Sequence, residues 1–209
     1  AYQKDPDNPD LLAVLSDMLG RAAMQSGNGQ LLQQSLQLAD QSVRRNPASV
    51  DALVDRSRLL LFMFQATQGQ RRDYAARASA DLAGARALSE AAALWTETAR
   101  AYLTQGQMEL ATSTLTEARR RAQAQNNQNE VARTYALVGV VRLFMGDEAG
   151  AVGSWSEALR TYPNLQGTYD FAPYLGRLGN EGRSRVLQAA PPQMRQQLEA
   201  MLRQQPNGR

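Results

Sequence analysis

The side chains that carry most enzyme chemistry are missing from this sequence. Its 209 residues include no His and no Cys. Their absence excludes Ser-His-Asp and Cys-His nucleophiles, histidine general bases, thiol redox chemistry and the usual zinc sites. Carboxylate chemistry and carboxylate metal sites remain, and the acidic pairs Asp147-Glu148 and Asp51/Asp55 are the candidates for them.

Neither acidic pair is placed as acid–base machinery would be. Asp147 and Glu148 come at the expected start of a helix, where negative charge complements the helix dipole. Asp51 and Asp55 are one helical turn apart on a stripe suited to solvent. We therefore expect a protein that is not an enzyme, with no catalytic residue, no metal and no cofactor.

A glycine-rich turn and three short arginine groups suggest phosphate or nucleic acid as ligands. Gly27-Asn28-Gly29 lacks the Lys-Ser/Thr that completes a phosphate loop, so it indicates a plain turn. The arginines lie at 71–72, 119–121 and 183/185, and the formal net charge is only +3. Because nucleic-acid binding needs a concentrated basic face, we interpret these groups as solvated helix faces and expect no nucleic-acid partner. A salt-sensitive nucleic-acid or small-ligand binder stays open as the third alternative.

Helices must position all of these residues. Ala, Leu, Gln and Arg dominate the composition, and β-branched residues never cluster over a strand's length, so we expect almost no sheet. Apolar residues at three- and four-residue steps, ended by Gly, Asn or Pro, predict four helix pairs and a last helix after Pro191-Pro192. The paired helices are predicted at 9–26, 30–45, 49–67, 71–88, 90–104, 108–125, 128–145 and 148–161. The longest apolar run, 59–64, is far shorter than the ~20 residues of a membrane span, so we expect a soluble domain, cytoplasmic or periplasmic.

The last two helix pairs share one spaced pattern of small and large residues. In the third pair the pattern is Trp95, Ala99, Tyr102, Gly106, Ala111, Leu115 and Ala118. In the fourth pair it is Tyr135, Gly139, Arg142, Gly146, Ala151, Trp155, Ala158 and Pro163. The small residue four positions after the first aromatic lets the second helix approach closely. Because such a pair cannot bury its apolar face alone, several pairs must stack into a solenoid.

This pattern resembles that of the tetratricopeptide repeat (TPR) family. The first two pairs match it poorly, and Arg142 stands where the family usually has Tyr or Leu. The resemblance implies an all-α, right-handed superhelical solenoid of about four helix pairs over 1–163, followed by C-terminal capping helices and a frayed tail over 164–209. Residues 1–6 are typical of the last turn of a second helix. We therefore expect the chain to start inside a repeat, and the natural protein to carry further repeats, an anchor or a signal.

The resemblance also implies a function, since TPR proteins generally hold a peptide or helix in a concave groove lined by the first helix of each pair. We expect a non-catalytic protein–protein interaction module or assembly scaffold. In the family's register the groove residues are Arg58, Leu61, Phe62, Thr96, Arg100, Leu103, Arg133 and Val140. Arginines pair well with carboxylates and apolar residues anchor a partner's side chains, so the expected partner is an acidic and apolar peptide or helix. The alternative is that the arginines pair with Asp51, Asp55 or Glu97 on their own helices, and that Phe62 and Phe144 belong to the core.

A second functional alternative is self-association. The edge of the first repeat, which the expected truncation leaves open, would then join copies of the chain as a homo-oligomer or as a structural subunit of a larger complex. Residues 8–12, a glycine-rich break and a helix ending at Asn46-Pro47 also resemble the periplasmic TPR module of bacterial cytochrome c maturation factors. That resemblance implies a periplasmic assembly factor.

Overall fold

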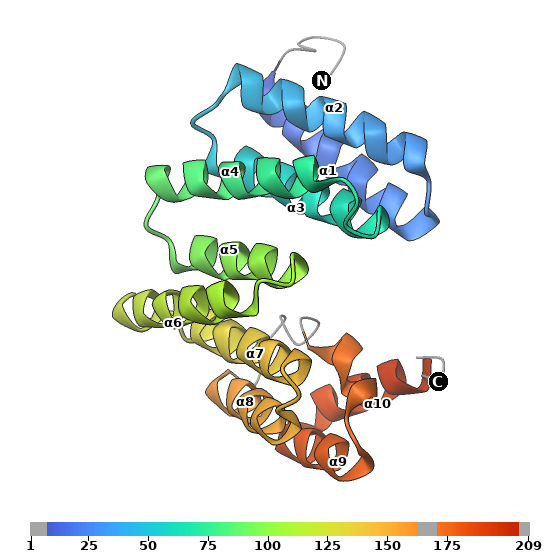
Figure 1. The fold of residues 1–209 in the computed structure, drawn as a ribbon, viewed down its shortest axis with the longest axis vertical. Helices are drawn as coiled ribbons and strands as arrows, with labels where there is room; N and C mark the ends of the chain where they lie inside the picture. The colour runs from blue at the N-terminus through green and yellow to red at the C-terminus, as the bar shows by residue number, and fades with distance from the viewer. Residues whose placement is uncertain (1–7, 163–170, 205–209) are drawn as a thin grey trace. The chain divides into compact units, whose positions relative to one another are not determined.

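The structure is a computed structural model that describes residues 8–162 and 171–204, and its regular structure in those ranges is helical (Figure 1). The chain divides into two compact units, Ala1–Glu90 and Ala91–Arg209. Unit 1 holds the helices α1 (Pro9–Ser26), α2 (Gly29–Arg45), α3 (Val50–Ala66) and α4 (Arg72–Leu88). Unit 2 holds α5 (Ala92–Thr104), α6 (Met108–Ala124), α7 (Gln128–Phe144), α8 (Glu148–Thr161), the 3-10 helix η2 (Ala172–Arg177), α9 (Asn180–Ala189) and α10 (Pro192–Gln204).

The predicted TPR-like helix pairs are confirmed, and each paired helix begins and ends within two residues of its predicted bounds. Local capping explains this agreement. Asn8, Ser49 and Asp147 each accept hydrogen bonds from backbone N–H groups in the first turn that follows. Gly106 and Gly146 follow α5 and α7 with positive φ angles of 74° and 83°, a conformation that ends a helix at little cost only for glycine.

Small side chains let the first two helices of unit 1 touch. The Ser16 hydroxyl donates to the carbonyl of Ser35 at 2.8 Å, and the Ser35 hydroxyl donates to the carbonyl of Ser16 at 2.7 Å. One turn along α1, a Cβ added to Gly20 would lie 3.0 Å from the Ser35 hydroxyl. These reciprocal bonds satisfy two buried hydroxyls and fix the register of α1 against α2.

A partly buried ionic network joins three helices of unit 1. Arg56 on α3 makes a two-pronged pair with Asp81 on α4, with Nε–Oδ2 and Nη2–Oδ1 distances of 2.9 and 2.6 Å. Its Nη1 also donates to Asp40 on α2 at 3.0 Å, and Arg77 donates to the same Asp40 oxygen at 2.6 Å. Because Arg56 and Asp81 are largely buried, removing either would leave the other short of a partner, and the network links α3 to both α2 and α4.

In unit 2 the predicted small residues lie where the helices meet. Ala99, Ala111 and Ala151 are buried. A Cβ added to Gly139 on α7 would lie 2.9 Å from Cε2 of Trp155 on α8, and closer still to its Nε1 and Cδ1. The Trp155 indole N–H donates to the carbonyl of Ala136 at 2.9 Å. The interpretation of these positions as contact sites between paired helices is therefore confirmed.

The C-terminal segment continues the core of unit 2. Phe171 stacks on Trp155 with ring centroids 5.3 Å apart and an interplanar angle of 18°. Leu175, Val186 and Leu198, from η2, α9 and α10, belong to the same apolar cluster as the buried faces of α7 and α8. The predicted boundary at Pro163, the predicted helical turn at 1–6 and the frayed end at 205–209 lie outside the described residues.

Candidate partner-binding surfaces

Three of the predicted groove residues belong to α3 in unit 1. Arg58 is exposed, and its Nη1 lies 3.4 Å from Oδ1 of Asp55, one turn earlier. Burial raises the pKa of Asp55 above its ordinary value of 3.8, although the charge of Arg58 opposes that rise; Asp17 on α1 adds to it. Phe62 is half-buried against the apolar cluster of this unit, whereas Leu61 is buried.

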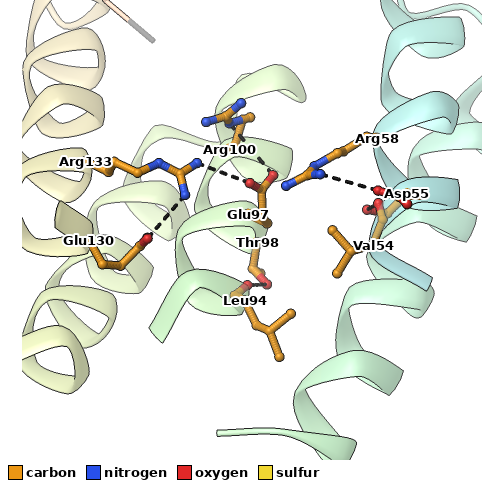
Figure 2. A network of polar contacts seen from close by, with 10 residues as sticks. Val54, Asp55, Arg58, Leu94, Glu97, Thr98, Arg100, Glu130 and Arg133 are labelled. Carbon is orange, nitrogen blue, oxygen red and sulfur yellow. Dashed lines mark hydrogen bonds and ion pairs between the residues drawn. The ribbon is translucent and has the colours of Figure 1, made fainter. Parts of the chain in front are cut away.

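In unit 2, four charged residues from α5 and α7 meet (Figure 2). The Arg133 guanidinium lies 3.3 Å from Oε1 of Glu97 through Nη2 and 3.2 Å from Oε2 of Glu130 through Nη1. Arg100 approaches Glu97 from the same helix, with an Nε–Oε2 distance of 3.9 Å. Glu97 and Glu130 are both buried, so each needs such partners to remain charged.

This cluster of Glu97, Arg100, Glu130 and Arg133, which we call the α5–α7 charge cluster, is electrically balanced. Its two guanidinium groups lie next to two carboxylates, and all four groups come from α5 and α7. The sequence alternative, that the groove arginines pair with Asp51, Asp55 or Glu97 on their own helices, is thus confirmed for Arg58 and Arg100. Arg133 departs from it, because it reaches Glu97 on a different helix and pairs on its own helix with Glu130. For Phe144 that alternative is wrong, because this ring is 44% exposed.

The remaining predicted groove residues divide by accessibility. Thr96 and Val140 have no exposed surface, and Val140 belongs to the apolar cluster that α7 and α8 share with the C-terminal segment. Leu103 is half-buried and packs against the same cluster. The accessible predicted groove residues are therefore Arg58 and Phe62 in unit 1 and, separately, Arg100, Leu103 and Arg133 in unit 2. That a partner touches any of them stays a prediction.

One group that sequence reasoning missed lies at the end of α7. The Phe144 and Tyr174 rings meet edge to face, with centroids 5.6 Å apart and an interplanar angle of 74°. The Arg177 guanidinium lies over both rings, 5.0 Å from the Phe144 centroid and 5.7 Å from the Tyr174 centroid. The three-residue step from Tyr174 to Arg177 is a signal for one of these contacts. Nothing in the sequence brings Phe144, 30 positions earlier, to the same place.

The described residues contain no group of three or more acidic side chains arranged to hold a metal ion. Within residues 8–162 and 171–204, no helix combines the length and the apolar character needed to cross a bilayer.

Comparison with known proteins identifies the fold. No protein-family model and no curated protein matches the chain. Among solved structures, the chain is similar to TTC0263, a thermophilic TPR protein of Thermus thermophilus, with a TM-score of 0.60 and 18% identity over 90% of this chain and 84% of that one. It is also similar to BtubC (BKLC) from P. vanneervenii, with a TM-score of 0.58 and 17% identity over 100% of this chain and 88% of that one. For pilF of Pseudomonas aeruginosa the TM-score is 0.54, with 20% identity over 96% of this chain and 78% of that one. The chain thus has the TPR-type helical repeat fold, and the resemblance found in its sequence is confirmed at that level.

Proposed function

We propose that this protein is a non-catalytic interaction scaffold that holds a peptide or helix of a partner protein on the first helices of its pairs. The observation that carries this proposal is the α5–α7 charge cluster, where Arg100 and Arg133 keep 34% and 20% of their side-chain surface exposed beside Leu103. TPR-type folds generally bind partners on the first helices of their pairs, and here that surface carries charged groups next to an apolar one.

The buried carboxylates of Glu97 and Glu130 restrict the arginine side chains before a partner binds. Glu97 and Glu130 hold the Arg133 guanidinium in place, and Glu97 also attracts Arg100 from 3.9 Å, so Arg133 has little side-chain freedom left to lose when a partner adds an acceptor. Because the cluster is balanced in charge, one carboxylate of a partner is attracted only modestly. The proposed partner therefore carries an apolar side chain next to its acidic one, and the apolar side chain packs against Leu103.

Charge reversal at Arg100 tests this proposal. A partner carboxylate that loses its charge-assisted hydrogen bond loses about 1.5–3 kcal/mol, which is about tenfold or more in affinity. We expect Arg100→Glu in the full-length protein to reduce partner capture by that factor. Arg160→Glu on α8 is the matched control, since Arg160 is also paired to an acid on its own helix, 2.9 Å away, and is 67% exposed. The proposal would be refuted if wild type and Arg100→Glu captured the partner equally well while circular dichroism showed that Arg100→Glu and Arg160→Glu are folded.

A specific observation favours self-association as the second candidate. On α1, Val14 and Met18 are one helical turn apart and are 55% and 57% exposed. Leu11 and Leu15 are half-buried on the same helix. We expect Met18→Lys to weaken association measured by sedimentation, whereas Leu110→Lys, at an exposed apolar residue of α6, leaves it unchanged. A wild-type protein that stays strictly monomeric at high concentration would rule this candidate out.

A further inference from the structure

We infer a second docking surface in unit 2, formed by the end of α7 and by η2, which binds a partner segment that presents a carboxylate beside an apolar side chain. We call this surface the Arg177 surface; it consists of Phe144, Met145, Pro173, Tyr174 and Arg177. It goes beyond the proposed function, because its residues are separate from the α5–α7 charge cluster and its test does not depend on that cluster.

The Arg177 guanidinium carries the charge of this surface. It is exposed and lies over the Phe144 and Tyr174 rings, and among the described residues no carboxylate forms an ion pair with it. Three other exposed arginines of unit 2, Arg120, Arg160 and Arg185, each pair with a glutamate three or four residues away. Arg177 thus contacts two aromatic rings, and no carboxylate in the described part of the chain takes up its N–H donors.

The geometry favours a carboxylate as the acceptor for these donors. The parallel N–H groups of a guanidinium match the two oxygens of a carboxylate. Contact with the two rings also restricts the Arg177 side chain before binding, so the pair costs less to form than one made by a free arginine. Arg142, near the end of α7, already has partners. Its Nη1 donates to the Gly150 carbonyl at 3.2 Å, and its Nε lies 4.0 Å from Oδ2 of Asp147.

Apolar side chains adjoin this charge. Phe144 is 44% exposed, Met145 beside it is 64% exposed, and Pro173 is exposed next to Tyr174. Single exposed apolar residues are ordinary on a protein surface, but here Met145 and Pro173 are sequence neighbours of two aromatic rings that contact each other and an arginine, which together have the composition of a binding hot spot. Methionine adds a flexible side chain that adapts to different apolar groups. The partner segment therefore needs both features, and an acidic residue alone binds weakly.

A pair of capped pentapeptides tests the inference. One has the sequence Ala-Leu-Glu-Leu-Ala, and the other has Gln in place of Glu. Binding to the full chain is followed by NMR of ¹³C-labelled methionine methyl groups, with Met145 reporting the surface and Met18 on α1 reporting unit 1. We expect the Glu peptide to shift the Met145 signal at millimolar concentration, the Gln peptide to bind about tenfold more weakly, and the Met18 signal to stay in place.

Matched variants distinguish a specific role of Arg177 from a general effect of the protein's positive charge. Arg177→Gln should abolish the preference for the Glu peptide. Arg177→Lys, which keeps the charge but loses the planar group, should reduce it. Arg185→Gln on α9 makes the same charge change at a paired arginine and should leave the preference intact. Equal binding of the two peptides, an unchanged Met145 signal, or an equal loss in Arg185→Gln would overturn the inference. Arg100→Glu should not alter this binding, so failure here and failure of the proposed function are distinguishable.

Discussion

Replacing Gly139 by Ala is expected to destabilise unit 2, although Ala is the better helix former. Gly139 lies in α7 beneath the indole of Trp155, which is fully buried. A methyl group there would lie 2.9 Å from Cε2 of Trp155 and closer to two other ring atoms. The indole cannot move aside freely, because it donates a hydrogen bond to Ala136 and stacks on Phe171.

Three effects determine how much Gly139→Ala changes the free energy of unfolding. Forcing an extra methyl group into a packed core costs about 1–3 kcal/mol. Pulling the indole N–H away from Ala136 leaves a buried donor unsatisfied, which costs about 1–3 kcal/mol more. Replacing Gly by Ala within a helix returns about 1 kcal/mol. We therefore expect a net loss of about 3 kcal/mol in the free energy of unfolding, which corresponds to a fall of roughly 6–12 °C in melting temperature.

Tryptophan fluorescence during urea unfolding is the assay, because the two tryptophans of the sequence, Trp95 and Trp155, both lie in unit 2. Gly153→Ala on α8 is the matched control. No atom lies within 4 Å of a Cβ built at that exposed position, so this variant should gain about 0.5–1 kcal/mol from helix propensity. If Gly139→Ala were as stable as Gly153→Ala, the close approach of α7 and α8 would not depend on the missing side chain.

Further predictions concern the ionic groups. Asp81→Asn should destabilise unit 1 by about 2–3 kcal/mol in chemical unfolding. This is less than the roughly 3–5 kcal/mol typical of a broken buried pair, because Asp40 still contacts Arg56. Unchanged stability would show that the network is dispensable. Hydrogen bonds from Arg120 and Arg121 lower the pKa of Glu117 from 4.5 to about 2. Its contribution to stability is therefore complete above pH 4.5 and is lost as the pH falls toward 2. The stability difference between wild type and Glu117→Gln should shrink over that range, and an NMR titration of Glu117 with a midpoint near 4.5 would contradict this.

Features set by neighbouring residues were predictable from the sequence. Helix bounds follow from caps, breakers and apolar periodicity, and these act within a few residues of each other. The seven-position pattern also located the small residues between paired helices, because close approach requires a small side chain at a fixed step. Gly139 opposite Trp155 is the clearest case.

Features that join distant segments were not predictable in the same way. Arg56 contacts acids 16 and 25 positions away on two other helices, and many pairings of charged residues satisfy the same helical pattern. Arg133 finds Glu97 on another helix, 36 positions earlier, as well as Glu130 on its own. The placement of Phe144 against Tyr174 depends on how the C-terminal segment turns back onto α7, which helical periodicity does not encode.

Site-specific photo-crosslinking tests the central claim, that the first helix of a pair holds the partner. A photoreactive side chain replaces Thr104 at the end of α5 or, as control, the exposed Thr116 on α6. The full-length protein is then irradiated in its source cells. We predict one reproducible protein crosslink from position 104 that is absent from position 116 and is reduced by Arg100→Glu. Equal crosslinking from both positions, or none from position 104, would contradict the account.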